Sequence, residues 1–136
     1  MDKHYELIVK TFYDNLEQGK ILGRKCTRCG HVAFPPYLAC NECGYHETEW
    51  VETSGKGEVT CVVAQSVLHS DAAINEEFGS YAYCTVKTAE GDEVNTVLLG
   101  VKKKELPALR TRLPLPVTAR IVQRDGYKAV FWELDK

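Results

Sequence analysis

The 136-residue sequence has no excess of positive charge and no long apolar segment. Its 17 lysine and arginine residues stand against 19 aspartate and glutamate residues, which gives a formal net charge of −2. Nucleic-acid binding draws on the neutralisation of phosphates and usually goes with a basic excess, so this class of function is disfavoured. No segment approaches the roughly 20 apolar residues that cross a bilayer, and no apolar run of a signal peptide stands at the start. These absences predict a cytoplasmic protein without a membrane segment.

The sequence signatures of catalysis are also missing. We find no Gly-x-Ser-x-Gly nucleophile elbow, no phosphate-binding glycine loop and no dinucleotide fingerprint. The four histidines are His4, His31, His46 and His69, and they do not stand at the spacings of metal ligands or of a triad. His31 and His46 lie close to cysteine pairs, and we interpret them as surface groups or as neighbours of a metal site. The sequence favours a binding or assembly module over an enzyme with its own chemistry.

Four of the six cysteines form two Cys-x-x-Cys-Gly knuckles, Cys26 with Cys29 and Cys40 with Cys43. Two intervening residues let both sulfurs of a pair face one ion, and the following glycine lets backbone N–H groups turn toward the thiolates. Four thiolates complete a tetrahedral shell with no open position, which is typical of a structural zinc site. Iron in a rubredoxin-like site is the alternative that the same ligands allow.

The two remaining cysteines, Cys61 and Cys84, lie in strand-like runs flanked by valine, tyrosine and threonine. No catalytic base is recognisable beside either of them. Because free cysteine behaves as a small apolar residue, both are predicted to be buried.

Residues 1–20 are predicted to form an amphipathic helix. Its apolar positions recur every three or four residues: Tyr5, Ile8, Val9, Phe12 and Leu16. Gly19 can end the helix in a left-handed conformation. A single helix of this length is marginal in water, so the apolar face needs a surface in this chain or on a partner.

Residues 21–50 and 51–136 differ sharply in character. The first stretch is rich in cysteine, glycine and proline and has no apolar period, so a metal is expected to supply its core. The second contains five strand-like runs, at 58–69, 81–88, 94–101, 117–124 and 127–134. Asp125-Gly126 is a strong hairpin signal, and the charged stretch 102–112 is predicted to hold a short helical turn. The fold is therefore predicted to be mostly β: an N-terminal helix, a zinc ribbon and a five-stranded OB-fold barrel.

The segment Phe34-Pro35-Pro36-Tyr37 lies between the knuckles, at the expected tip of the ribbon. Proline holds such a segment extended, and the two aromatic residues flank it. One interpretation is that Phe34 packs beneath the metal while Tyr37 has no particular role. The other is that the tip docks onto a partner or a ligand, where aromatic residues contribute most.

These features together resemble the DUF35 family. The resemblance covers essentially the whole chain: the helix with Phe12 and Leu16, then GKILGRKCTRCGHVAFPPYLACNECG, then EWVETSGKGEV leading into the barrel. In that family a rubredoxin-like zinc ribbon precedes an OB-fold domain. Tyr37 stands where the family often has arginine, so the resemblance carries no anion-binding role over to this position.

The resemblance implies a small, noncatalytic subunit of a thiolase-like acyl-CoA enzyme complex. The larger subunit would carry the catalytic residues, and this chain would support assembly and help to hold coenzyme A. Phosphates of coenzyme A need cations, and Arg24, Lys25 and Arg28 cluster beside the first knuckle. A second basic group contains Lys102, Lys103, Lys104, Arg110 and Arg112. The bland interpretation of both groups is ordinary solvated charge.

The site residues expected from this comparison fall into two sets. The metal ligands are Cys26, Cys29, Cys40 and Cys43. The expected partner or coenzyme A contacts are Arg24, Lys25, Phe34, Pro35, Pro36 and Tyr37. Two other functions stay open: a stand-alone acyl-CoA-binding protein, and a nucleic-acid-binding ribbon with an OB-fold, since fold does not fix function.

Overall fold

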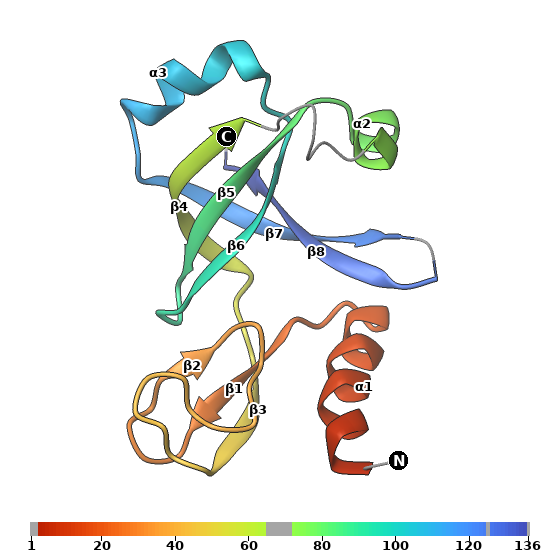
Figure 1. The fold of residues 1–136 in the computed structure, drawn as a ribbon, viewed down its shortest axis with the longest axis vertical. Helices are drawn as coiled ribbons and strands as arrows, with labels where there is room; N and C mark the ends of the chain where they lie inside the picture. The colour runs from red at the N-terminus through yellow and green to blue at the C-terminus, as the bar shows by residue number, and fades with distance from the viewer. Residues whose placement is uncertain (1–2, 65–71, 125, 136) are drawn as a thin grey trace.

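A computed structural model describes residues 3–64, 72–124 and 126–135 of the chain. The chain begins with α1 (Lys3–Glu17), continues into a small three-stranded sheet and ends in a closed barrel (Figure 1). This confirms the predicted fold class, which is mostly β with an N-terminal helix, a four-cysteine ribbon and a five-stranded barrel. Within the described ranges, no helix is long and apolar enough to span a membrane.

The three-stranded sheet, here called the ribbon, contains β1 (Leu22–Cys26), β2 (Val32–Ala33) and β3 (Thr48–Glu52). Its strand order is β2-β1-β3, and both pairings are antiparallel. Cys26 is the last residue of β1, Cys29 lies in the turn between β1 and β2, and the second cysteine pair lies in the long loop between β2 and β3. The sheet therefore brings two loops to one end, where the knuckles meet.

The barrel contains β4 (Lys56–Ala64), β5 (Tyr81–Thr88), β6 (Glu93–Leu99), β7 (Leu115–Gln123) and β8 (Lys128–Leu134). They close in the order β4-β5-β6-β8-β7. Only β6 and β8 pair in parallel among the described strands; the other neighbours are antiparallel. In barrel numbering this order is first, second, third, fifth, fourth, the Greek-key closure of an OB-fold.

The predicted strands agree with the observed ones to within about two residues where both are described. The predicted run 58–69 continues past the end of β4, but its residues 65–69, which include His69, lie outside the described residues. Asp125 of the predicted hairpin turn also lies outside them. A short helix, α2 (Ala72–Phe78), was not expected from the sequence. The charged stretch holds the predicted helical turn, as a 3₁₀ turn (Lys103–Glu105) followed by α3 (Leu106–Arg110).

Two apolar clusters stabilise the barrel. The interior contains nearly inaccessible side chains from every strand: Val59, Val86, Leu98, Val117 and Trp132. Leu106 and Leu109 of α3 close one end of this interior. The second cluster lies outside the barrel wall, where Ile74 and Phe78 of α2 join side chains of β5, β6, β7 and β8.

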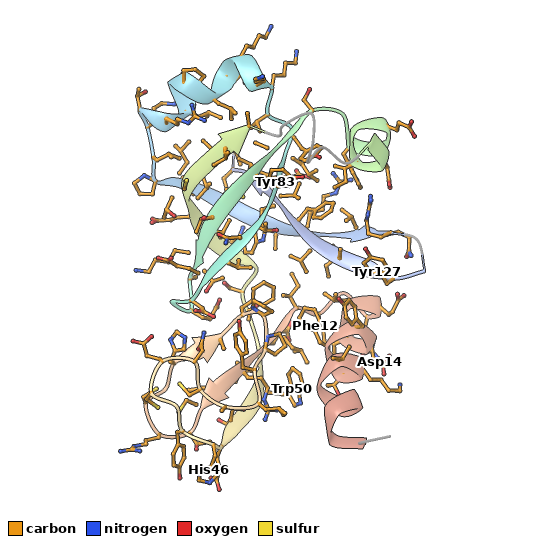
Figure 2. The ribbon with its side chains drawn as sticks, viewed as in Figure 1. Phe12, Asp14, His46, Trp50, Tyr83 and Tyr127 are labelled. Carbon is orange, nitrogen blue, oxygen red and sulfur yellow. The ribbon has the colours of Figure 1, made fainter. Side chains whose placement is uncertain are left out.

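The ribbon and α1 both join the barrel's interior cluster. Phe34 is 6% exposed and belongs to that cluster, and Phe12 of α1 packs against it. The two ring centroids lie 6.1 Å apart, and Figure 2 shows Phe12 between α1, the ribbon and the barrel. Leu16 is fully buried, so Phe12 and Leu16 of the apolar face of α1 cover this chain's own surface, whereas Val9 of the same face is 51% exposed. The side chains of Tyr5 and Ile8, in the predicted stripe, lie outside the described residues.

Gly57 is a position where the backbone of the barrel approaches too closely for a side chain. A Cβ atom there would lie 2.7 Å from the carbonyl oxygen of Lys87 and 2.9 Å from Cγ1 of Val86. We expect Gly57→Ala to lower the free energy of unfolding by about 1–3 kcal/mol, because neighbouring backbone must move. Urea denaturation measures this loss.

The matched control is Glu58→Ala, at an exposed position of the same strand. It should change the free energy of unfolding by less than about 0.5 kcal/mol. Equal stability of Gly57→Ala and the unsubstituted protein would contradict the close approach.

Candidate metal centre

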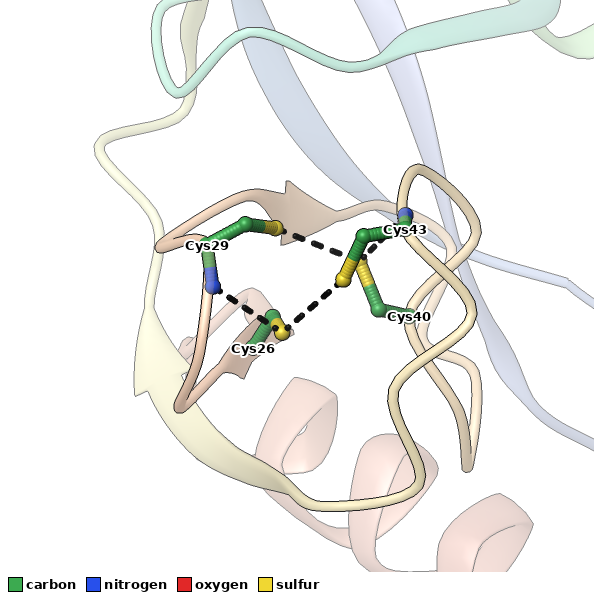
Figure 3. Close-up of side chains that lie close together, drawn as sticks. All are labelled: Cys26, Cys29, Cys40 and Cys43. Carbon is green, nitrogen blue, oxygen red and sulfur yellow. Dashed lines mark hydrogen bonds between the residues drawn. The ribbon is translucent and has the colours of Figure 1, made fainter.

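The four knuckle cysteines converge on one point. Their sulfur atoms all lie within 4.8 Å of one another, and Figure 3 shows them turned toward a common centre. Cys26 Sγ lies 3.7 Å from Cys43 Sγ, and Cys29 Sγ lies 3.6 Å from Cys40 Sγ. A tetrahedron of sulfurs at the usual zinc–sulfur distance has edges of about 3.8 Å. The spacing fits a four-coordinate zinc ion with no position open to substrate.

Backbone N–H groups stabilise negative charge on one sulfur of each knuckle. The N–H groups of Arg28 and Cys29 donate to Cys26 Sγ at 3.3 and 3.4 Å. Those of Glu42 and Cys43 donate to Cys40 Sγ at the same distances. Gly30 and Gly44 follow the knuckles, both with φ of +79°, a conformation that glycine adopts readily. The two knuckles thus have the same local geometry.

The thiol pKa values reflect this arrangement. The pKa of Cys26 is lowered to about 6, chiefly by the backbone N–H of Cys29, and that of Cys40 is also lowered, chiefly by the N–H of Cys43. The pKa of Cys29 is raised to about 12: the N–H of His31 lowers it, but burial and the three neighbouring thiols outweigh this effect. Four thiolates this close repel one another, and a divalent cation removes that penalty.

Arg24 and Lys25 lie side by side on β1 but differ in their surroundings. The Arg24 guanidinium donates to the hydroxyl and the carbonyl oxygen of Thr48, and it lies 4.7 Å from the ring centroid of Trp50. Its side chain therefore braces β1 against β3. Lys25 is exposed. Arg28, also exposed, lies over the ring of Tyr45 at 5.6 Å.

The segment from Phe34 to Tyr37 does not form a free tip. Phe34 is buried against the barrel, so its ring is not exposed for docking. Pro35 is exposed, Pro36 is half-buried and Tyr37 is 47% exposed. The segment therefore turns one aromatic ring inward and the other toward solvent.

The second basic group lies far from the knuckles. Lys102, Lys103 and Lys104 are exposed residues just before α3, and Arg110 of α3 donates to the carbonyl oxygen of Val62. Figure 1 shows α3 at the end of the barrel opposite the ribbon. The two basic groups are therefore not parts of a single site.

Asp92, in the turn between β5 and β6, is the site residue that the sequence analysis missed. Its carboxylate accepts a hydrogen bond from the backbone N–H of Phe34 at 2.8 Å and lies 3.5 Å from Nε2 of His31. His31 is thus a neighbour of the metal site that faces the barrel, whereas His46 is exposed beside Glu47. An aspartate in a hairpin turn carries no sequence signal for such a contact, because the turn and the knuckles are far apart in the chain.

The prediction for the remaining cysteines is half wrong. Cys84 is buried in the barrel, as expected, but Cys61 is exposed. The register of β4 shifts between Val59 and Cys61, so the alternation of inward and outward side chains breaks there. Thr60 and Cys61 are consequently both exposed.

Comparison with known proteins agrees with this geometry. A family model described as the ChsH2 rubredoxin-like zinc ribbon domain matches residues 14–49. Two relatives are DUF35 domain-containing scaffold proteins: one from Methanothermobacter thermautotrophicus, 27% identical over 67% of this chain and 67% of its own, and one from Pyrococcus furiosus, 29% identical over 66% and 63%. A third such scaffold protein, from Methanocaldococcus jannaschii, is 26% identical over 74% of this chain and 70% of its own.

Solved structures extend the likeness to the whole fold. A chain of "Ltp2-ChsH2(DUF35) aldolase" superposes with a TM-score of 0.67 at 19% identity and covers 92% of each chain. A DUF35 protein of unknown function from Sulfolobus solfataricus gives a TM-score of 0.55 at 14% identity, over 94% of this chain and 85% of its own. Fold and site define a rubredoxin-like zinc ribbon attached to an OB-type barrel. The comparisons support the resemblance to the DUF35 family that the sequence showed.

Metal removal should unfold the ribbon before the barrel. Bound zinc contributes about 10 kcal/mol or more to a small ribbon, whereas the barrel has an apolar interior of its own. We expect chelation or Cys40→Ser to make residues 21–50 sensitive to protease while most of the barrel stays protected. Limited proteolysis with mass mapping and metal analysis measures this.

Cys61→Ser is the matched control, because it makes the same substitution outside the knuckles, and it should retain the metal. Protease resistance of the ribbon after chelation would contradict a structural metal. If the purified protein is red and contains iron, the site is a rubredoxin-like iron site and not a zinc site.

The two barrel thiols should differ in reactivity. Burial, and then the proximity of Cys61, raises the pKa of Cys84 to about 12, so almost none of it is thiolate at pH 8. We expect iodoacetamide to alkylate Cys61 in the folded protein and Cys84 only after unfolding. Peptide mass mapping over time measures both, and comparable rates in the folded protein would contradict this assignment.

Proposed function

We propose that this chain is a noncatalytic subunit of a thiolase-like acyl-CoA enzyme complex. In this role Cys26, Cys29, Cys40 and Cys43 bind one structural zinc ion. The zinc holds the ribbon rigid, and the ribbon and α1 together form the contact surface for a larger subunit that carries the catalytic residues.

The observation that carries the proposal is an exposed apolar surface on α1 and the ribbon loop, here called the apolar face. Val9 and Tyr13 of α1 are 51% and 41% exposed, and Tyr37 and Leu38 of the loop are 47% and 55% exposed. Val9, Phe12, Tyr13, Pro35 and Pro36 line a groove of about 190 Å³ between the two elements. Clustered exposed apolar and aromatic groups are typical of protein interfaces.

The relatives support the kind of partner. Three are named scaffold proteins, and one similar structure is named "Ltp2-ChsH2(DUF35) aldolase". For this chain we propose a thiolase-like partner, on its sequence resemblance to the zinc-finger subunit of benzoylsuccinyl-CoA thiolase from anaerobic toluene degradation. Benzoylsuccinyl-CoA with coenzyme A is accordingly the first substrate pair to test on the assembled complex.

The proposed contacts with the partner or with coenzyme A divide by exposure. Lys25, Pro35 and Tyr37 are exposed and are proposed as direct contacts, with Pro36 at the edge of the groove. Arg24 and Phe34 are engaged within the chain and are proposed to hold that surface in shape. Charge reversal of Lys25 tests the coenzyme A contribution, because unchanged affinity of the complex for coenzyme A would remove it.

The interface is tested by matched substitutions. We expect Val9→Asp and Tyr37→Ala each to lower affinity for the larger subunit at least tenfold, because apolar anchors at interfaces contribute most of the binding energy. Val63→Asp is the control, since Val63 is 52% exposed but lies on β4 of the barrel. Co-purification from the native host identifies the partner, and calorimetry with the purified subunit measures affinity.

Three outcomes decide against the proposal. If only Val63→Asp lowers affinity for the larger subunit, the interface lies on the barrel wall and not on the apolar face. Submillimolar binding of coenzyme A by the isolated chain, with no co-purifying acyl-CoA enzyme, would favour a stand-alone acyl-CoA-binding protein. Salt-sensitive binding to single strands would favour a nucleic-acid-binding role.

A further inference from the structure

One carboxylate of the barrel reaches both cysteine knuckles. Besides the backbone N–H of Phe34, Asp92 accepts hydrogen bonds from the side-chain amide of Asn41, with Nδ2 at 3.3 Å from Oδ2 and 3.4 Å from Oδ1. Asn41 lies inside the second knuckle, and His31 follows the first, with Nε2 3.5 Å from Asp92 Oδ1. Asp92 therefore contacts the flank of each knuckle and the segment that joins them.

Asp92 itself is firmly placed. Thr88, which is 6% exposed, accepts a hydrogen bond from the N–H of Asp92 and donates both its hydroxyl and its own N–H to the carbonyl oxygen of Asp92. The side chains of Asp92 and His31 are only 13% and 15% exposed. The carboxylate is thus held at the end of a barrel hairpin, largely away from water, where its hydrogen bonds are stronger.

The first knuckle is linked to this contact through the backbone. The carbonyl oxygen of His31 accepts a hydrogen bond from the N–H of Cys26 at 2.9 Å. A shift of His31 relative to Asp92 would therefore also shift Cys26, one of the ligand residues. In the second knuckle, Asn41 directly follows the ligand residue Cys40 and is one of the two residues between Cys40 and Cys43. Each knuckle thus has one short path to the same carboxylate.

We propose that Asp92 is a positioning residue of the zinc site, which holds the two knuckles in the arrangement that binds the ion and so raises zinc affinity. The inference rests on the proposed binding of zinc by the four cysteines. Without the Asp92 carboxylate, the two loops lose the polar contacts with the barrel that they share, and the ion must order them further on binding. Groups that orient metal ligands from outside the coordination shell typically change affinity 10–100-fold.

Coupling of this kind is reciprocal. If Asp92 favours zinc binding, bound zinc favours the hydrogen bonds of the hairpin turn that carries Asp92. Removal of zinc from the unsubstituted protein should then speed amide hydrogen exchange at Thr88 and Asp92. In Asp92→Asn the same amides should respond little to zinc.

The test measures zinc affinity by competition with a chromophoric chelator at fixed neutral pH. We expect Asp92→Asn to lower affinity about 10–100-fold, because an amide offers one acceptor oxygen and turns its own N–H groups toward donors. Glu93→Gln is the control, since it removes one negative charge at the next, exposed position, and its affinity should be unchanged.

A second pair of variants keeps the inference testable if Asp92→Asn fails to fold. Asn41 and Glu42 are both exposed residues of the second knuckle, and we expect Asn41→Ala to lower zinc affinity severalfold and Glu42→Ala to leave it unchanged. Where the double variant folds, Asn41→Ala should add little in the Asp92→Asn background, because both remove one contact.

The outcomes separate this inference from the proposed zinc site. An unsubstituted protein that binds no zinc would overturn both. Zinc binding of equal affinity in the unsubstituted protein, Asp92→Asn and Asn41→Ala would overturn the role of Asp92 and leave the zinc site standing. Equal losses in Asp92→Asn and Glu93→Gln would also overturn it, because they would assign the effect to charge alone.

Discussion

The attachment of Phe34 to the barrel is the contact on which the rest of the arrangement depends. Its ring is buried with the barrel's interior residues, and its N–H donates to Asp92 in the hairpin between β5 and β6. This residue lies between the two knuckles, so anchoring it places both of them against the barrel. The ring of Phe12 packs on the same aromatic residue, which fixes α1 beside the ribbon. Helix, ribbon and barrel thus meet at one side chain.

The packing of Phe12 and Phe34 at this junction determines which aromatic side chains are buried and which are exposed. Aromatic contacts continue along α1, from Phe12 to Tyr13 and from Tyr13 to Tyr127 of the barrel. The aromatic residues that face the interior stabilise the chain. Those that face solvent belong to the apolar face, the surface proposed to contact a partner. The sulfur cluster lies at the far end of the ribbon loops, where a closed shell suits a structural ion. Four cysteine ligands leave no open coordination position on such an ion.

Much of this organisation was predictable from local pattern. The knuckles were recognisable because ligand spacing within each pair is a local property, and the strands of the barrel followed from valine-rich runs and turn residues. The first helix ends near Gly19 as expected, with φ of +82°. Cys61 was misassigned because a register shift cannot be read from alternation alone, and α2 was missed because its short apolar segment shows no extended period.

The sequence by itself determined the four knuckle cysteines, the number of barrel strands and the absence of recognised catalytic motifs, because each depends on residues that are neighbours in the chain. Only the tertiary structure decided that Phe34 is buried while Tyr37 is exposed, and that Arg24 braces the ribbon. It also brought Asp92 to His31 and Asn41 across about fifty to sixty residues of chain. Contacts of that kind depend on how the ribbon docks on the barrel, and docking is set by the packing of whole surfaces, which no local pattern encodes.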